Sequence, residues 1–169
     1  MIHRVPSGAR QPVEPELVLG APAGEWAYRS ACWSLDGSAL FALAQHVGES
    51  GTDFLAKHTV VVSVPAAGLP AASAPAPEEA RQVDYTESES LVPYGSESVL
   101  ACARVRGTGE LHRIGADGTV DVLSAGPRFI HGAAASGGTI VVSHISEDSP
   151  GECSVLETGG VRRLTDFAA

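Results

Sequence analysis

Residues 110–126 read Glu-Leu-His-Arg-Ile-Gly-Ala-Asp-Gly-Thr-Val-Asp-Val-Leu-Ser-Ala-Gly. Two runs of strand-forming residues flank Asp117-Gly118, a dipeptide that favours a tight hairpin in which both turn residues have positive φ. After the turn, Val120 and Val122 alternate with polar residues, as in a strand with one buried face. This stretch therefore predicts two antiparallel strands joined by a short turn.

The same pattern recurs further along the chain. Residues 99–102 (Val-Leu-Ala-Cys) and 140–143 (Ile-Val-Val-Ser) are both strand-like runs, and they lie 41 residues apart. Val120 and Val161 are separated by the same 41 residues. Two independent features with one period indicate an internal repeat, which points to a propeller or a solenoid.

An earlier copy of the repeat is longer. Residues 40–43 follow Asp36-Gly37 and match residues 99–102 at an offset of 59. The additional length falls in the polar stretch 45–57 and in the Pro/Ala-rich stretch after Gly68, and repeat folds tolerate such insertions in loops. At the N-terminus, residues 2–5 are similar to residues 111–114, which predicts part of another unit.

The units resolve into short strands separated by Gly, Pro, Asp or Ser, and no segment has a sustained helical period. The expected strands are 28–34, 39–44, 59–64 and 81–85, then 89–94, 98–104, 110–115 and 119–124, then 129–135, 139–145, 152–157 and 161–165. Four antiparallel strands repeated every 40–45 residues are typical of a β-propeller blade. We therefore predict an all-β partial β-propeller of about three and a half blades, with a half blade at 1–20 and blades at 26–85, 88–125 and 128–167. A small β-sandwich is the alternative fold.

The composition limits the function classes. The chain has 169 residues, a formal net charge of −9 and a single lysine, Lys57, which argues against nucleic-acid binding because that needs a basic face. Three widely spaced cysteines (Cys32, Cys102 and Cys153) predict no disulfide framework and a reducing compartment. No signal peptide or membrane-spanning run is recognisable, so we expect a cytoplasmic protein without a membrane partner.

Several motifs resemble those of a known family. Residues 32–41, Cys-Trp-Ser-Leu-Asp-Gly-Ser-Ala-Leu-Phe, resemble the W-S-P-D-G-x-x-I-x-F element of propeller repeats in TolB-like proteins and prolyl oligopeptidase-family serine peptidases, with Leu35 in place of the usual proline. Residues 152–167 are similar to an ending of that family, E-L-Y-V-L-D-x-x-G-G-x-x-R-R-L-T-D-F, and residues 111–118 to L-Y-R-V-D-x-D-G. The acylaminoacyl-peptidase-like branch resembles the chain most.

This resemblance implies a role in peptide hydrolysis. In such enzymes a propeller restricts access to a C-terminal α/β-hydrolase domain, whose Ser-Asp-His triad cleaves peptide or acyl-amino-acid bonds. That domain would begin after Ala169, so the resemblance implies that this chain is a non-catalytic, substrate-gating propeller fragment that meets peptides through the parent enzyme. The alternative is a free-standing TolB-like propeller that acts as a protein-interaction module, closed by self-association through open blade faces.

A direct search for chemistry agrees with a non-catalytic chain. No Gly-x-Ser-x-Gly nucleophile motif occurs, and Gly48-Glu49-Ser50-Gly51 lacks its spacing. Gly107-Thr108-Gly109 is no phosphate-binding loop. The six histidines lack metal-ligand spacing; they are His3, His46, His58, His112, His131 and His144. We interpret the acidic clusters as solvated charge in loops; they comprise Glu87, Glu89, Glu97, Glu147, Asp148 and Glu152. We interpret Trp26, Tyr28 and Trp33 as residues that pack within the blades. The sequence thus predicts no catalytic, cofactor-binding or metal-binding residue and no cofactor.

Overall fold

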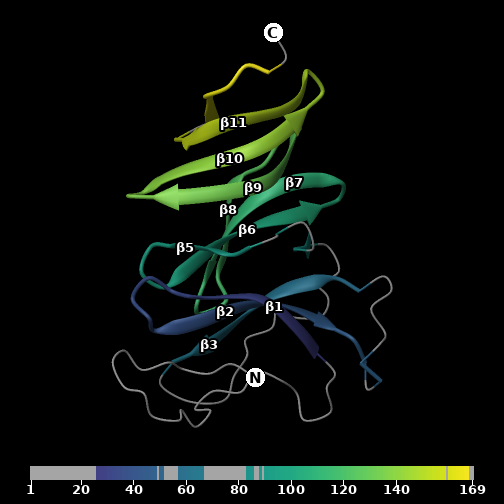
Figure 1. Ribbon diagram of the computed structural model, residues 1–169, viewed down its shortest axis with the longest axis vertical. Coiled ribbons are helices and arrows are strands. Elements are labelled where there is room, and N and C mark those ends of the chain that lie inside the picture. The colour runs from purple at the N-terminus through teal and green to yellow at the C-terminus, as the bar shows by residue number, and fades with distance from the viewer. Residues whose placement is uncertain are drawn as a thin grey trace, which may run out of the picture.

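A computed structural model of the chain describes residues 26–48, 50–51, 57–66, 83–85, 88, 90–158 and 160–167 (Figure 1). The described residues form strands and turns and contain no helix. The strands are β1 (Trp26–Trp33), β2 (Ala39–His46), β3 (Thr59–Pro65), β4 (Val83–Asp84), β5 (Val92–Tyr94), β6 (Ser98–Val105), β7 (Thr108–Gly115), β8 (Val120–Ser124), β9 (Arg128–Ser136), β10 (Thr139–Ser146), β11 (Ser149–Glu157) and β12 (Gly160–Arg163). The all-β prediction is confirmed.

The strands group into three antiparallel units, here called the first blade (β1–β3), the second blade (β5–β8) and the third blade (β9–β12). Within each blade, strands that follow one another along the chain pair antiparallel. Figure 1 shows the blades following one another along the long axis of the molecule. The described blades form open sheets, so the prediction of a partial propeller is confirmed and the β-sandwich alternative is wrong.

The fourth strand expected for the first blade at 81–85 forms in part and pairs elsewhere. Val83 and Asp84 are β4, and their ladder partners are Val105 and Arg104 of β6 in the second blade. β4 also contacts the first blade, because the Thr59 amide donates to the Asp84 carboxylate at 2.9 Å. This segment therefore links two blades. The predicted half blade at 1–20 lies outside the described residues.

The turn at Asp117-Gly118 differs from the prediction. Gly118 has a φ of 86°, whereas Asp117 is absent from the positive-φ residues of the described chain. The amide of Gly118 donates to the Gly115 carbonyl at 3.0 Å, and the Asp117 carboxylate accepts from the amide and the hydroxyl of Thr119. An aspartate that bonds the backbone two residues ahead stabilises a turn in which one residue alone needs positive φ. The prediction of positive φ at both turn residues is thus wrong, although the hairpin is confirmed.

The core lies between blades, and the pleat of β6 divides it. Val99, Ala101 and Ala103 face the first blade, where they pack with Phe41 and Leu43. The alternate residues of β6 face the third blade, and the buried residues of that cluster are Leu100, Cys102, Leu111, Ile130, Ile140 and Val142. A strand buried on both faces reads as a continuous apolar run. Each fully buried leucine or valine contributes about 2 kcal/mol, so the blades hold one another together.

Candidate functional site

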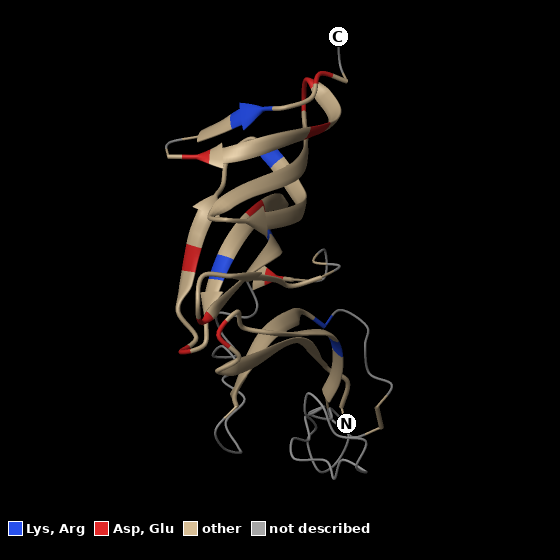
Figure 2. Cartoon of the chain, turned by 60° about the vertical axis from the view of Figure 1, so that its left-hand side comes forward, with Lys and Arg blue, Asp and Glu red and all other residues tan. Residues whose placement is uncertain are grey.

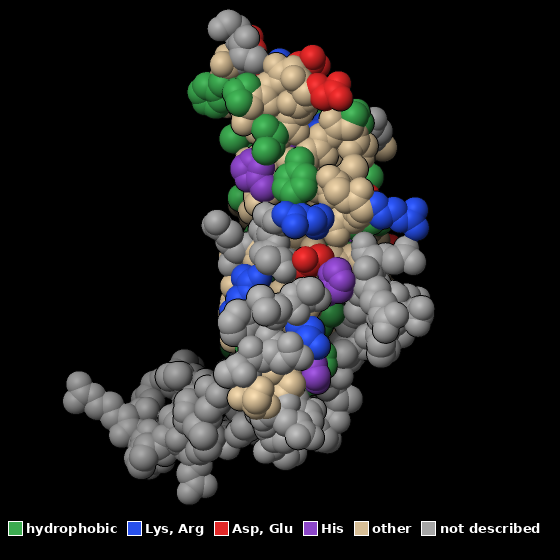
Figure 3. Space-filling model, turned by 90° about the vertical axis from the view of Figure 1, so that its right-hand side faces the viewer, with side chains coloured by type: hydrophobic (Ala, Val, Ile, Leu, Met, Phe, Trp, Pro, Cys, Tyr) green, Lys and Arg blue, Asp and Glu red, His purple; other side chains and the backbone are tan. Residues whose placement is uncertain are grey.

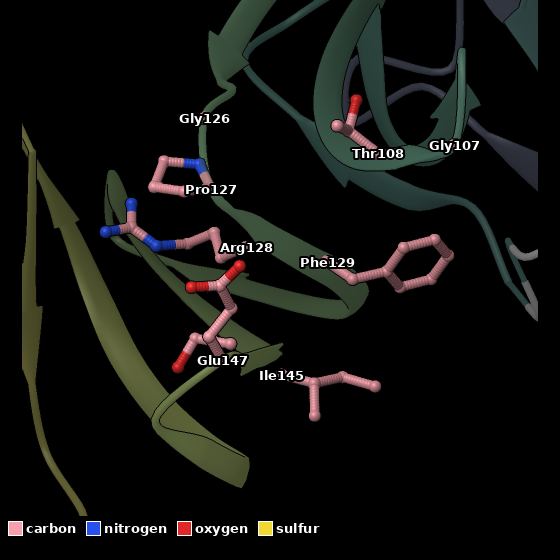
Figure 4. Close-up of a pocket in the computed structure, with 9 residues that line it drawn as sticks. Gly107, Thr108, Gly126, Pro127, Arg128, Phe129, Ile145 and Glu147 are labelled. Atoms are coloured by element: carbon pink, nitrogen blue, oxygen red, sulfur yellow. The ribbon is translucent and has the colours of Figure 1, made fainter.

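Two adjacent cavities lie where β9 begins and β10 ends. The first has a volume of about 390 Å³ and is lined by Gly107, Thr108, Gly126, Pro127, Arg128, Phe129, Ile145, Ser146 and Glu147 (Figure 4). The second, here called the Arg128 pocket, has a volume of about 420 Å³. It is lined by Pro127, Arg128, His144, Ser146, Glu147, Asp148, Ser149, Glu152, Ser154, Val161 and Arg163. Both volumes fall in the range of small-molecule sites.

The local backbone places these side chains. Gly126 has a φ of 124°, a region that favours glycine, and its carbonyl accepts a hydrogen bond from the Arg128 amide at 2.8 Å. The chain then enters β9, where successive side chains point to opposite faces. Figure 4 shows Arg128 and Phe129 leaving the strand in opposite directions. The first cavity is therefore apolar around Phe129 and Ile145, and the Arg128 pocket is polar.

Glu152 is the most heavily bonded polar group of the Arg128 pocket. Its side chain is buried, and its carboxylate accepts from Ser149 Oγ at 2.9 Å and from the Phe167 amide at 3.0 Å. The Arg163 guanidinium and the Thr165 hydroxyl donate to it as well. The hydrogen bond from Arg163, followed by those from Thr165 and Ser149, lowers the pKa of Glu152 to about 2. Glu152 therefore carries a charge that its own neighbours compensate.

His144 and Ser154 form a second polar pair in this pocket. Nε2 of His144 lies 3.0 Å from Ser154 Oγ, and both residues are buried. Nδ1 of His144 is buried and has no hydrogen-bond partner among the described residues. Burial lowers the pKa of His144, and the positive charge of Arg128 lowers it further. The imidazole is therefore neutral near pH 7.

The Ser154–His144 distance is that of a nucleophile and its base, but the surroundings do not suit covalent catalysis. A hydrolase triad needs a carboxylate on the other imidazole nitrogen and donors for the oxyanion. Glu152 stands opposite His144 in the β10–β11 ladder, yet its printed partners are Ser149, Arg163, Thr165 and Phe167. The side chain of Ser154 is 1% exposed. This pair is a buried polar contact of the pocket wall.

The structure distributes the other residues considered above over the blades. Among the described residues, no three His, Cys, Asp or Glu side chains are placed to hold a metal ion. His58 lies 3.9 Å from the Asp84 carboxylate, and Trp26 stacks edge-on against His46. Trp26 and Tyr28 pack against the apolar cluster of the first blade, as predicted, whereas Trp33 is 37% exposed. His3, Glu49, Glu87 and Glu89 lie outside the described residues.

Charged residues do not form a single-sign face on the described chain. Figure 2 shows acidic residues mostly at turns and in the C-terminal segment, with few basic residues between them. The exposed ion pairs of Arg113 with Asp121 and of Arg162 with Glu157 fit this pattern. Figure 3 shows hydrophobic side chains on the surface of the C-terminal half, beside a histidine and basic residues. The described ranges include no helix long and apolar enough to cross a membrane.

Sequence reasoning named four residues of the Arg128 pocket (His144, Glu147, Asp148 and Glu152) but predicted no site from them. Glu152 was interpreted as solvated loop charge, but it stands on β11 and is 3% exposed, so that interpretation is wrong. Arg128 belongs to none of the motifs in the sequence. The signal that could have found them is hairpin register: pairing β10 with β11 brings His144 opposite Glu152, and a turn at 147–148 sets that register.

A solved structure with the same fold supports the architecture. The chain is similar to the β-propeller domain of the Trilobed protease from Pyrococcus furiosus, a domain with an open velcro topology, at a TM-score of 0.55 and 12% sequence identity. The similarity covers 82% of this chain and 41% of that one, so the chain spans less than half of the length of this relative. No protein-family model matches the sequence, and a search of curated proteins finds no match. At this identity the likeness establishes the fold: the chain is part of a β-propeller.

Proposed function

We propose that the chain is the propeller part of a peptidase and controls which peptides reach a catalytic centre carried by other residues. The observation that supports this proposal is the structural similarity to the β-propeller domain of a protease. The motif resemblance at residues 32–41 and 152–167 points in the same direction.

The stacked blades provide a physical basis for gating. Apolar clusters fill both interfaces between the described blades, so each blade is a stiff wall that excludes a folded substrate. A few polar contacts cross these interfaces and set how easily blades separate. Ser63 Oγ on the first blade donates to the Ala116 carbonyl beside the second blade at 2.8 Å. Loss of such a bond changes an opening equilibrium by about 1 kcal/mol, or about fivefold.

The test uses the protein expressed from its whole natural coding region, with peptides of increasing length and a folded protein as substrates. We expect hydrolysis of short peptides and little of the folded protein. Ser63→Ala should leave the rate on a short peptide unchanged and raise the rate on long substrates about fivefold. Ser136→Ala, at an exposed position of β9 in the third blade, is the matched control. Absence of peptidase activity would contradict the proposal. So would a Ser63→Ala variant whose hydrolysis rate changes by the same factor for short and long substrates.

A second candidate function is a protein-interaction module that self-associates. The observation that favours it is the exposure of apolar side chains on the described blades: Val120 and Val122 on β8 are 49% and 55% exposed. Apolar surface of this kind marks contact sites when it is contiguous. Sedimentation velocity of the 169-residue chain distinguishes the two functions, since a stable symmetric oligomer supports the module and a monomer supports the gating part.

A further inference from the structure

The Arg128 pocket contains a guanidinium that forms no ion pair with the described residues. Arg128 lines the pocket and makes no hydrogen bond or ion pair through its side chain with the described residues. In contrast, Arg163 on the opposite side is engaged by Glu152 and Asp166. A guanidinium presents five N–H donors in a planar fork that fits a carboxylate or another oxyanion. Arg128 is therefore the group of this pocket that is available to a ligand.

His144 is the second group that points to a ligand. It lines the same pocket, is 7% exposed, and its Nδ1 lacks a partner among the described residues. Leaving a buried polar atom unsatisfied is costly, so native proteins rarely do so without a functional reason. Ser154 occupies Nε2, which fixes the ring and leaves Nδ1 to interact with another group. A ligand that brings a negative charge beside Arg128 also stabilises the protonated form of this ring.

The remaining charges limit the charge of the ligand. The pocket is lined by two arginines (Arg128 and Arg163) and three carboxylates (Glu147, Asp148 and Glu152). Glu152 is compensated by its four donors, whereas Glu147 and Asp148 lie in the β10–β11 turn. This lining has one more carboxylate than it has guanidinium groups, so it repels a dianion such as phosphate more strongly than a singly charged ligand. A single carboxylate also matches the one guanidinium, that of Arg128, which has no ion-pair partner among the described residues. The volume of about 420 Å³ leaves room for an organic group on the carboxylate.

We propose that the Arg128 pocket binds a small organic monocarboxylate, held by a paired hydrogen bond from the Arg128 guanidinium and by the His144 imidazole. This chemistry is shared by a free organic acid and by the C-terminal carboxylate of a short peptide. The proposal does not depend on the gating function, because the pocket is built within the third blade and the turn that precedes it.

Binding of the carboxylate is coupled to protonation of His144. The charged groups that face this ring are Arg128 and His131 from β9, Glu152 from β11 and Arg163 from β12, with Glu147 and Asp148 in the turn. Arg128 lowers the pKa of His144 in the free protein, and a carboxylate beside Arg128 cancels that effect. The bound state thus takes up a proton more readily, and affinity increases as the pH falls from about 8 to about 6.

Benzoate and its uncharged isostere benzamide test the proposal on the full chain by calorimetry and by NMR. We expect benzoate to bind at least tenfold more tightly than benzamide, and Arg128→Gln to remove that difference. Arg128→Lys should retain part of the preference for benzoate, because lysine keeps the positive charge but lacks the planar pair of N–H donors of a guanidinium. Arg162→Gln is the matched control, since Arg162 is exposed, pairs with Glu157 and does not line the pocket.

The protonation of His144 can be followed directly, without a substitution at this buried residue. The ¹⁵N shifts of His144, followed against pH, should show a pKa that rises when benzoate is added and does not rise with benzamide. Tri-alanine with a free C-terminus, compared with its amide, distinguishes the two sources: stronger binding of tri-alanine than of benzoate assigns a peptide terminus, and the reverse assigns a free acid. Equal binding of benzoate and benzamide, or a His144 titration that benzoate leaves unchanged, would overturn the proposal.

Discussion

The phenolic oxygen of Tyr85 lies 3.0 Å from Nδ1 of His112, and both side chains are buried between the first and second blades. Nε2 of the same ring lies 2.9 Å from the Glu110 carboxylate. Because a carboxylate can accept but not donate, Nε2 carries the proton and Nδ1 accepts from the phenol. Burial, and then the charge of Glu110, raise the pKa of Tyr85, which keeps the phenol a donor over the ordinary pH range.

Tyr85→Phe removes that donor and leaves a buried imidazole nitrogen unsatisfied. We expect the free energy of unfolding to fall by about 1–3 kcal/mol, measured by urea denaturation. Tyr94→Phe is the control, because the Tyr94 hydroxyl has no hydrogen bond among the described residues and the half-buried ring stands on β5 of the second blade. Equal losses in the two variants would show that the Tyr85–His112 contact contributes nothing specific.

Acid should weaken the third blade through Glu152. The pKa of this carboxyl is lowered to about 2 in the folded chain from an ordinary 4.5, first by the hydrogen bond from Arg163. A lowered folded-state pKa means that the stabilisation is complete above the unfolded pKa and is lost as the pH falls through the folded one. Thermal unfolding between about pH 5 and pH 2 should therefore show a shallower decline for Glu152→Gln than for the wild type.

The control for this measurement is Glu157→Gln, which removes an exposed carboxylate on the same strand β11 and its surface pair with Arg162. Its acid profile should follow that of the wild type, since exposed ion pairs contribute little. An unchanged slope for Glu152→Gln would mean that the four donors around Glu152 do not select its charged form.

The strands were predictable because their signals are local. Residues 99–103 alternate between two interfaces and are apolar throughout. The turns between strands contain glycines with positive φ such as Gly118 and Gly137. Pairing across blades was not predictable in the same way. Residues 83–84 have strand-forming character, but whether they pair with β3 or with β6 depends on how the first and second blades stack.

The candidate site was not predictable for a related reason. Its members come from the start of β9, the β10–β11 turn and the C-terminal strand, which are far apart in sequence. The lack of a nucleophile motif and of metal-ligand spacing argues against catalytic residues in the sequence. It could not reveal a pocket, because no sequence motif identifies an arginine without an ion-pair partner. Glu152 was assigned to a loop because the preceding residues Glu147 and Asp148 lie in one. In the structure, the register of the β10–β11 hairpin places Glu152 opposite His144, at a buried position.

Burial should protect Cys102 from thiol reagents. This side chain lies in the core between the second and third blades, is 4% exposed, and burial raises the pKa of its thiol to about 11. Because the thiolate is the reactive form, modification by iodoacetamide near pH 8 should be negligible in the folded chain and complete in urea. Mass spectrometry of peptides locates the label, and Cys153, which is partly exposed, serves as the internal comparison.

Gly109 should be the least replaceable glycine at the contact between the second and third blades. A Cβ at this position would lie 2.6 Å from the backbone nitrogen of Ile130 and 2.7 Å from its carbonyl oxygen. Gly109 also forms the parallel bridge with Phe129 that joins β7 to β9, and backbone atoms cannot give way as a side chain does. Gly109→Ala should therefore lower the free energy of unfolding by about 1–3 kcal/mol and increase amide exchange in β9.

Gly151→Ala provides the comparison for Gly109→Ala. Gly151 lies in β11, has no positive φ, and a Cβ there would meet nothing within 4 Å. Because alanine restricts the unfolded chain more than glycine does, this variant should be neutral or more stable by up to about 1 kcal/mol. If the two alanine variants unfold at the same urea concentration, β7 and β9 are not held by the close backbone approach at Gly109. A loss confined to Gly109→Ala would identify that approach as the feature that sets the spacing of the two blades.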